Sequence, residues 1–130
     1  FDEYSKTQVI EGPHVSISFG LDGGGGIRLR RVNGSSQLLV TTFSQLGWCF
    51  FESAFDKGAG ELRFQKIRSS VGRGVTYEDF YLSITDEQLN YMSKKGLDVR
   101  IYGTNRTINV ELPAIYVQGF VKRTRELGKS

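Results

Sequence analysis

Apolar and polar residues alternate along most of this chain, as they do in strands that bury one face. Between residues 14 and 19, Val15, Ile17 and Phe19 alternate with polar residues. Successive side chains on a strand point to opposite faces, so this alternation predicts a half-buried strand. We therefore expect about six to eight strands in a mainly antiparallel sheet. The pattern returns at 27–30, 37–43, 61–65, 75–82, 97–102 and 107–112.

Turn signals separate these segments. The sequence contains 16 Gly and only 2 Pro, which favours tight turns with positive φ in an antiparallel sheet. Asn33 and Gly34 predict a type I′ hairpin turn, because both positions of that turn need positive φ. The four glycines at 23–26 predict the flexible tip of a long hairpin loop that starts at residue 20, since no Lys followed by Ser or Thr completes a phosphate-binding loop. The apolar run at 48–53 predicts a central strand.

Two segments predict short helices that pack on the sheet, at about 85–95 and 113–126. Thr85 can cap the first helix while Gln88, three residues later, reaches back to it, as in a capping box. Pro113 suits the first position of the second helix, in which apolar residues recur at four-residue spacing. The fold class expected from the sequence is therefore α+β, with a mainly antiparallel sheet and two helices.

We expect all 130 residues to form one domain, with residues 1–13 as an arm or short edge segment. Hydrophobic residues make up only 38% of the chain, but nine Phe, six Tyr and one Trp bury a large area each, which predicts an aromatic core. The sequence has no apolar run near the roughly 20 residues that a membrane-spanning helix needs.

The residues with the most reactive side chains do not form a recognisable catalytic pattern. Cys49 is the only Cys, so the chain cannot form an internal disulfide, and Cys49 with the only His, His14, cannot complete a zinc site. Cys49 lies in an aromatic run and is expected to be a packed core thiol. We expect no cofactor and no catalytic residue, although an enzyme of an unrecognised type stays a third alternative.

Neighbouring carboxylates give no stronger signal. Glu78 and Asp79 are adjacent on a predicted strand and therefore point to opposite faces. Glu52, Asp56 and Glu61 offer fewer oxygen ligands than a calcium loop requires. We therefore expect no metal site.

The binding candidates are arginine and tyrosine residues on predicted strands. Tyrosine suits protein interfaces, whereas arginine beside aromatic rings suits single-stranded nucleic acid. The net charge of +3 gives only a weak positive field. We expect the domain to bind a protein or a small ligand, with nucleic acid or another polyanion as the alternative. The candidate residues are Arg28, Arg30, Arg63, Arg68, Tyr77, Tyr81 and Tyr102.

Four segments in the last two thirds of the chain carry a family resemblance: GWCFFESAFD, VTYEDFYLSIT, GLDVRIYG and VELPAIYVQGFVKR. Their order, over about residues 47–127, resembles a set of uncharacterised small bacterial envelope proteins, many of them predicted lipoproteins. The resemblance implies a location in the envelope or periplasm, with the cytoplasm as the alternative, and it implies no catalytic residue. Because the chain starts at Phe1 and its only Met is Met92, we expect that a cleaved export signal, or shortening for expression, removed upstream residues.

Overall fold

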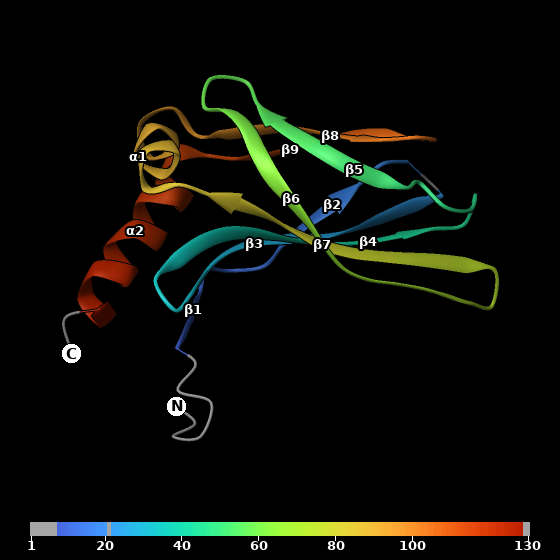
Figure 1. Ribbon diagram of the computed structural model, residues 1–130, viewed down its shortest axis with the longest axis horizontal. Coiled ribbons are helices and arrows are strands. Elements are labelled where there is room, and N and C mark those ends of the chain that lie inside the picture. Colours follow the sequence, from blue (N-terminus) through green and yellow to red (C-terminus); the bar gives the residue numbers. More distant parts are fainter. Residues whose placement is uncertain (1–7, 21, 129–130) are drawn as a thin grey trace.

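The computed structural model describes residues 8–20 and 22–128, which form a curved antiparallel sheet with two helices at one end (Figure 1). The predicted α+β class is confirmed, and the sheet has nine strands within these described residues, slightly more than expected. Residues 1–7 of the predicted arm lie outside the described residues. The strands are β1 (Val9–Glu11), β2 (Val15–Ser18), β3 (Gly23–Val32), β4 (Ser35–Ser44), β5 (Phe51–Asp56), β6 (Gly60–Gly72), β7 (Val75–Ile84), β8 (Leu97–Gly103) and β9 (Thr107–Leu112), and the helices are α1 (Asp86–Lys95) and α2 (Ala114–Gly128).

The sheet curls into a half-barrel whose inner face forms the core. Its strand order is β1-β3-β4-β7-β6-β5-β8-β9, with β2 also paired to β3, and every pair is antiparallel. Phe80 on β7 stacks on Phe64 of β6 with ring centroids 4.6 Å apart and meets Phe51 of β5 at 5.5 Å. The core is therefore aromatic where the two halves of the sheet meet.

Both predicted helices are confirmed, and each is tied to the sheet by hydrogen bonds. Thr85 and Gln88 form the predicted capping box of α1. The Gln88 amide also donates to the carbonyl oxygens of Ala59 and Glu61, at 3.2 and 2.9 Å, which fixes α1 on the β5–β6 turn. On α2, the Tyr116 hydroxyl accepts a hydrogen bond from the Leu29 amide of β3 at 3.3 Å.

The prediction of a flexible glycine tip at 23–26 is wrong. These glycines lie in β3 and pair with β4, and residues 24–26 also pair with β2, which leaves only residues 19–22 between β2 and β3; Leu21 lies outside the described residues. Glycine is needed here because neighbouring atoms occupy the space of a side chain. A Cβ at Gly25 would lie 1.8 Å from the Thr41 carbonyl oxygen, and one at Gly26 would lie 1.8 Å from His14 Nε2.

The strand predicted at 48–53 starts later than expected. β5 begins only at Phe51, because the chain turns at Gly47 and Phe50, where φ is +99° and +55°. By contrast, the type I′ turn between β3 and β4 is confirmed, with φ of +49° at Asn33 and +85° at Gly34. The departures from alternation thus occur where backbone conformation, and not side-chain pattern, decides the structure.

We predict that Gly25→Ala lowers the free energy of unfolding by about 3 kcal/mol, because the added methyl group meets backbone at a position whose φ is +155°. The control is Gly72→Ala, where no atom lies within 4 Å of an added Cβ. That variant should unfold at the same urea concentration as the original protein or a slightly higher one. Equal losses in the two variants would contradict the close packing of β3.

Candidate functional site

The outer face of the half-barrel carries the seven predicted binding residues, but it does not gather them into one site. Six of them lie on β3, β7 and β6, and the register turns their side chains to the face opposite to that of buried residues such as Leu29 and Phe80. Tyr102 is separate, because it lies on β8 and contacts Phe55 edge to face at 5.9 Å. The six on the first half of the sheet are Arg28, Arg30, Arg63, Arg68, Tyr77 and Tyr81.

Several arginines on this face already have partners. Arg28 Nη1 lies 3.0 Å from a carboxylate oxygen of Glu11, and Arg68 Nε lies 3.0 Å from one of Asp79. The Arg30 guanidinium lies 5.9 Å from the centre of the Tyr81 ring. Two of the four arginines are thus paired with carboxylates within the sheet, which reduces the positive field available to a polyanion.

A second surface, which the sequence did not predict, lies where β6 leaves β5. The two strands pair only between Ala54–Asp56 and Gly60–Leu62, and from Arg63 onward β6 pairs with β7 alone among the described residues. The opening holds a cavity of about 280 Å³, which we call the β5–β6 cleft. Its lining residues are Trp48, Phe50, Phe51, Glu52, Lys66, Ser69 and Glu78.

Buried Glu78 organises the wall of this cleft. Its carboxylate accepts hydrogen bonds from the backbone amides of Cys49, at 2.9 Å, and Phe51, at 3.3 Å. Between these anchors Phe50 adopts a left-handed conformation, which costs about 1 kcal/mol for a residue with a side chain. The Phe50 ring is half exposed and stacks on Trp48, with centroids 6.1 Å apart. Glu78 therefore holds two aromatic rings at the mouth of the cleft.

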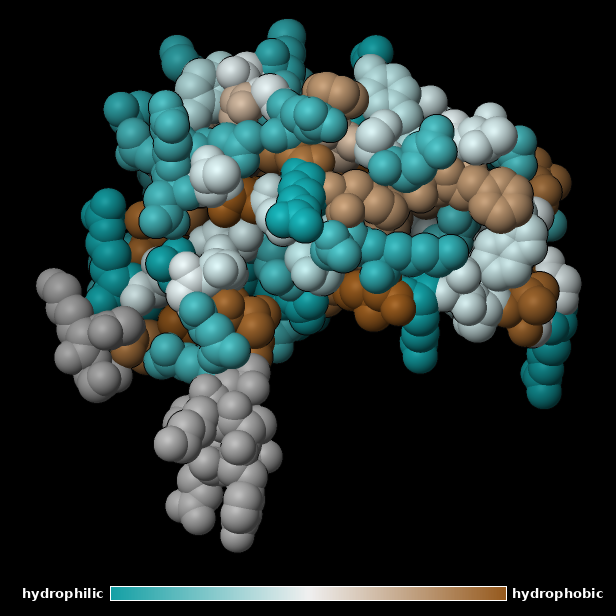
Figure 2. All heavy atoms as spheres, viewed as in Figure 1, coloured by the Kyte–Doolittle hydropathy of each residue, from teal (hydrophilic) through white to brown (hydrophobic). Residues whose placement is uncertain are grey.

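The far half of β6 is unusually exposed for a strand. Every residue from 65 to 72 is exposed, so the strand shows both faces and one edge to solvent. Figure 2 shows apolar atoms along β5, the loop before it and the β6–β7 hairpin. Six of the twelve large apolar or aromatic side chains exposed in the described part of the chain lie at this end: Phe43, Leu46, Phe50, Ile67, Val71 and Tyr77.

The groups considered for catalysis lie apart. The His14 ring covers Gly26 on the outer face, whereas Cys49 is 2% exposed and packs in the core. Burial raises the pKa of the Cys49 thiol, and the nearby Glu78 carboxylate raises it further. Because a raised pKa keeps the thiol protonated, Cys49 is a poor nucleophile in the folded protein.

Asp56, one of the three carboxylates considered for cation binding, has local hydrogen-bond partners. The Asp56 carboxylate accepts hydrogen bonds from the amides of Gly58, Ala59 and Asp98, at 2.8–3.0 Å, and so stabilises the β5–β6 turn. Within residues 8–20 and 22–128, no group of three or more His, Cys, Asp or Glu side chains is placed to hold a metal ion.

Comparisons of this chain with models of known protein families, with curated proteins and with solved structures find no match. Neither helix in the described part of the chain is long and apolar enough to cross a membrane. The chemistry of the described surfaces is therefore the basis for any functional proposal.

We predict that the protein loses stability above pH 9 because of Cys49. Burial raises its pKa above the ordinary value of 9.0, so the unfolded chain releases the thiol proton at a lower pH than the folded chain does. The stability from this group is complete below about pH 9.0 and is lost as pH rises toward the folded pKa. Tyr116, whose pKa burial raises above 10.0, acts in the same direction at higher pH.

Urea unfolding at pH 8, 9 and 10 measures this effect. In the original protein the free energy of unfolding should fall between about pH 9.0 and pH 10.0, the ordinary pKa values of Cys and Tyr. We expect this fall to be smaller in Cys49→Ala and unchanged in Tyr116→Phe. An unchanged slope in Cys49→Ala would show that other groups cause the fall.

Proposed function

We propose that this protein is a non-enzymatic binding domain of the bacterial envelope that captures an extended segment of a partner protein along the free edge of β6. One observation carries the proposal: β6 from Arg63 to Gly72 pairs on one side only, among the described residues, and every residue of its far half is exposed. A strand with unpaired amide and carbonyl groups is a template onto which another strand can add.

The length and charge of this edge define the partner. Ten residues in an extended conformation span about 33 Å, which is long enough for a ladder of main-chain hydrogen bonds. Residues 63–73 contain the cations Arg63, Lys66 and Arg73, besides Arg68, which is paired with Asp79, and they contain no acidic residue. We therefore expect a partner segment in which acidic side chains alternate with apolar ones, the latter facing Trp48 and Phe50.

A simpler explanation of the same edge is protection from aggregation. Natural proteins guard free edges with charged side chains and β-bulges, and β6 has Lys66, Arg68 and a register shift between them. That explanation does not account for the exposed Ile67 and Val71 on the same strand, because apolar side chains make an edge more adhesive. The unpaired main chain of β6, together with these exposed apolar side chains, therefore favours the docking of a partner strand.

The other parts of the proposal have separate support. The non-enzymatic role is supported by the protonated, buried Cys49 and by its separation from His14. The envelope location rests on the resemblance over about residues 47–127. A polyanion-binding role is the alternative, and the pairing of Arg28 and Arg68 with carboxylates argues against it.

Site-specific photocrosslinking in the cells that produce the protein tests the proposed docking edge. We expect a photoreactive phenylalanine analogue at Ser69 to give a discrete protein adduct. The matched control places the analogue at exposed Arg123 on α2, where we expect none. Adding Ile67→Lys and Val71→Lys should remove the Ser69 adduct, because the apolar flank is lost. Adducts of equal yield at both positions, or none at Ser69, would refute the docking edge.

Fractionation of the same cells tests the proposed location. We expect the protein in the periplasmic or membrane fraction, together with its crosslinked adduct. Recovery with cytoplasmic proteins would overturn the envelope assignment and leave the docking edge to be judged by the crosslinking alone.

A further inference from the structure

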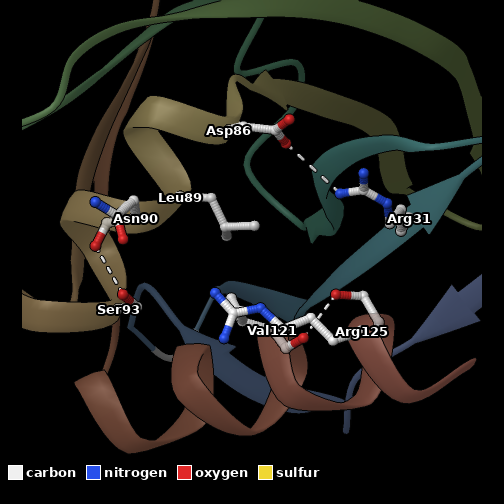
Figure 3. A pocket seen from close by; sticks show the side chains of 8 residues that line it. Arg31, Asp86, Leu89, Asn90, Ser93, Val121 and Arg125 are labelled. Carbon is white, nitrogen blue, oxygen red and sulfur yellow. Dashed lines mark hydrogen bonds and ion pairs between the residues drawn. The ribbon is translucent and has the colours of Figure 1, made fainter. Parts of the chain in front are cut away.

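A cavity of about 450 Å³ lies between the two helices and the β3–β4 hairpin (Figure 3). It is at the opposite end of the molecule from the tip of the β6–β7 hairpin (Figure 1), so it is independent of the proposed docking edge. Its volume falls within the range of small-molecule sites. The lining residues are Arg31, Asp86, Leu89, Asn90, Ser93, Val121, Thr124 and Arg125.

The cavity combines an apolar floor with a polar rim. Leu89 points from α1 into the space between the helices, and Val121 faces it from α2 (Figure 3). The rim offers the side-chain amide of Asn90. The hydroxyl groups of Ser93 and Thr124 also line it, but each donates its proton to a backbone carbonyl oxygen of its own helix, that of Asn90 or Val121, at 2.7 Å. A few polar groups around an apolar surface are typical of sites that bind and orient a small ligand.

The two arginines on the rim differ in how they are held. Arg31 Nη1 donates to the Ser36 hydroxyl at 2.9 Å and lies 3.6 Å from a carboxylate oxygen of Asp86, which is itself 84% exposed. The Arg125 guanidinium forms no ion pair or hydrogen bond with the residues that the structure describes, and it extends along α2 toward α1 (Figure 3). The rim thus carries two positive charges, those of Arg31 and Arg125, and one negative charge, that of the exposed Asp86.

We propose that this cavity binds a small organic anion with a compact apolar body, such as a short-chain carboxylate. The apolar body lies against Leu89 and Val121, and the anionic group accepts hydrogen bonds from Arg125. Arg31 supplies a second positive charge. A cation of the same size has only the exposed Asp86 carboxylate to bind and meets both guanidinium groups, so the site discriminates by the sign of the charge.

The test uses two probes with the same apolar body and opposite charge, hexanoate and hexylammonium. Each is titrated into the isotope-labelled protein, and amide chemical shifts report both the place of binding and the affinity. A ligand this small binds in the millimolar range. We expect saturable shifts for hexanoate on α1, α2 and the β3–β4 hairpin, and none there for hexylammonium.

Three variants separate the proposed contacts from general charge effects. Arg125→Gln should weaken hexanoate binding about tenfold, as expected for a charge-assisted hydrogen bond. Arg123→Gln, which removes the same charge from an exposed position on the same helix, should leave the affinity within about twofold. Asp86→Asn should tighten binding about threefold, because it removes the negative charge beside Arg31 at the rim.

The results decide the proposal in either direction. It stands if hexanoate binds at the helices, Arg125→Gln weakens binding more than Arg123→Gln does, and Asp86→Asn strengthens it. It fails if hexanoate shifts no residue around the cavity, if the two probes bind there equally, or if the two arginine variants behave alike. The amide spectrum of each variant shows directly whether it is folded.

Discussion

The rest of the structure depends on how a curved, open sheet is closed over its core. Arg106, in the loop just before β9, donates to the Phe19 carbonyl oxygen at 3.0 Å, forms an ion pair with Asp22, and lies 5.0 Å from the centre of the Phe19 ring. It thereby joins the last hairpin to the first without a strand ladder. At the other end, Tyr116 on α2 bonds to Leu29 and to the Pro13 carbonyl oxygen. In the part of the chain that the structure describes, side chains, and not backbone pairing, hold the two margins of the half-barrel together.

This closure explains where the surfaces with binding potential lie. Once the outer margins are joined, the remaining opening is the one between β5 and β6, where the two halves of the sheet separate beyond Leu62. Glu78 crosses that opening from β7 and holds the backbone of Cys49 and Phe51 in place. The cleft, its aromatic rim and the free edge of β6 thus follow from one geometric cause. The cavity between α1 and α2 has another, because it lies where the helices cover the opposite end of the half-barrel.

The sequence predicted the elements better than their arrangement, and the reason is physical. Alternation and capping act between near neighbours, which is why the strands, the Asn33–Gly34 turn and the helix at Thr85 are confirmed. The local sequence predicts a loop at the glycines 23–26, because nothing nearby shows that their role depends on His14 and Thr41, which are distant in sequence. The bond between Arg106 and Asp22 spans 84 residues and leaves no local pattern. The exposure of β6 arises from the divergence of two strands, which alternation cannot indicate.

Amide hydrogen exchange in Arg106→Gln and Asp22→Asn tests the closure most directly. If Arg106 joins the margins, each variant exchanges at least about tenfold faster in β2 and β9, because one charge-assisted contact is lost, while the β5–β6 turn held by Gln88 is unaffected. The double variant should add little to Arg106→Gln, since that variant already removes the ion pair with Asp22. Exchange that rises uniformly through the sheet, or that does not change in β2 and β9, would contradict the account.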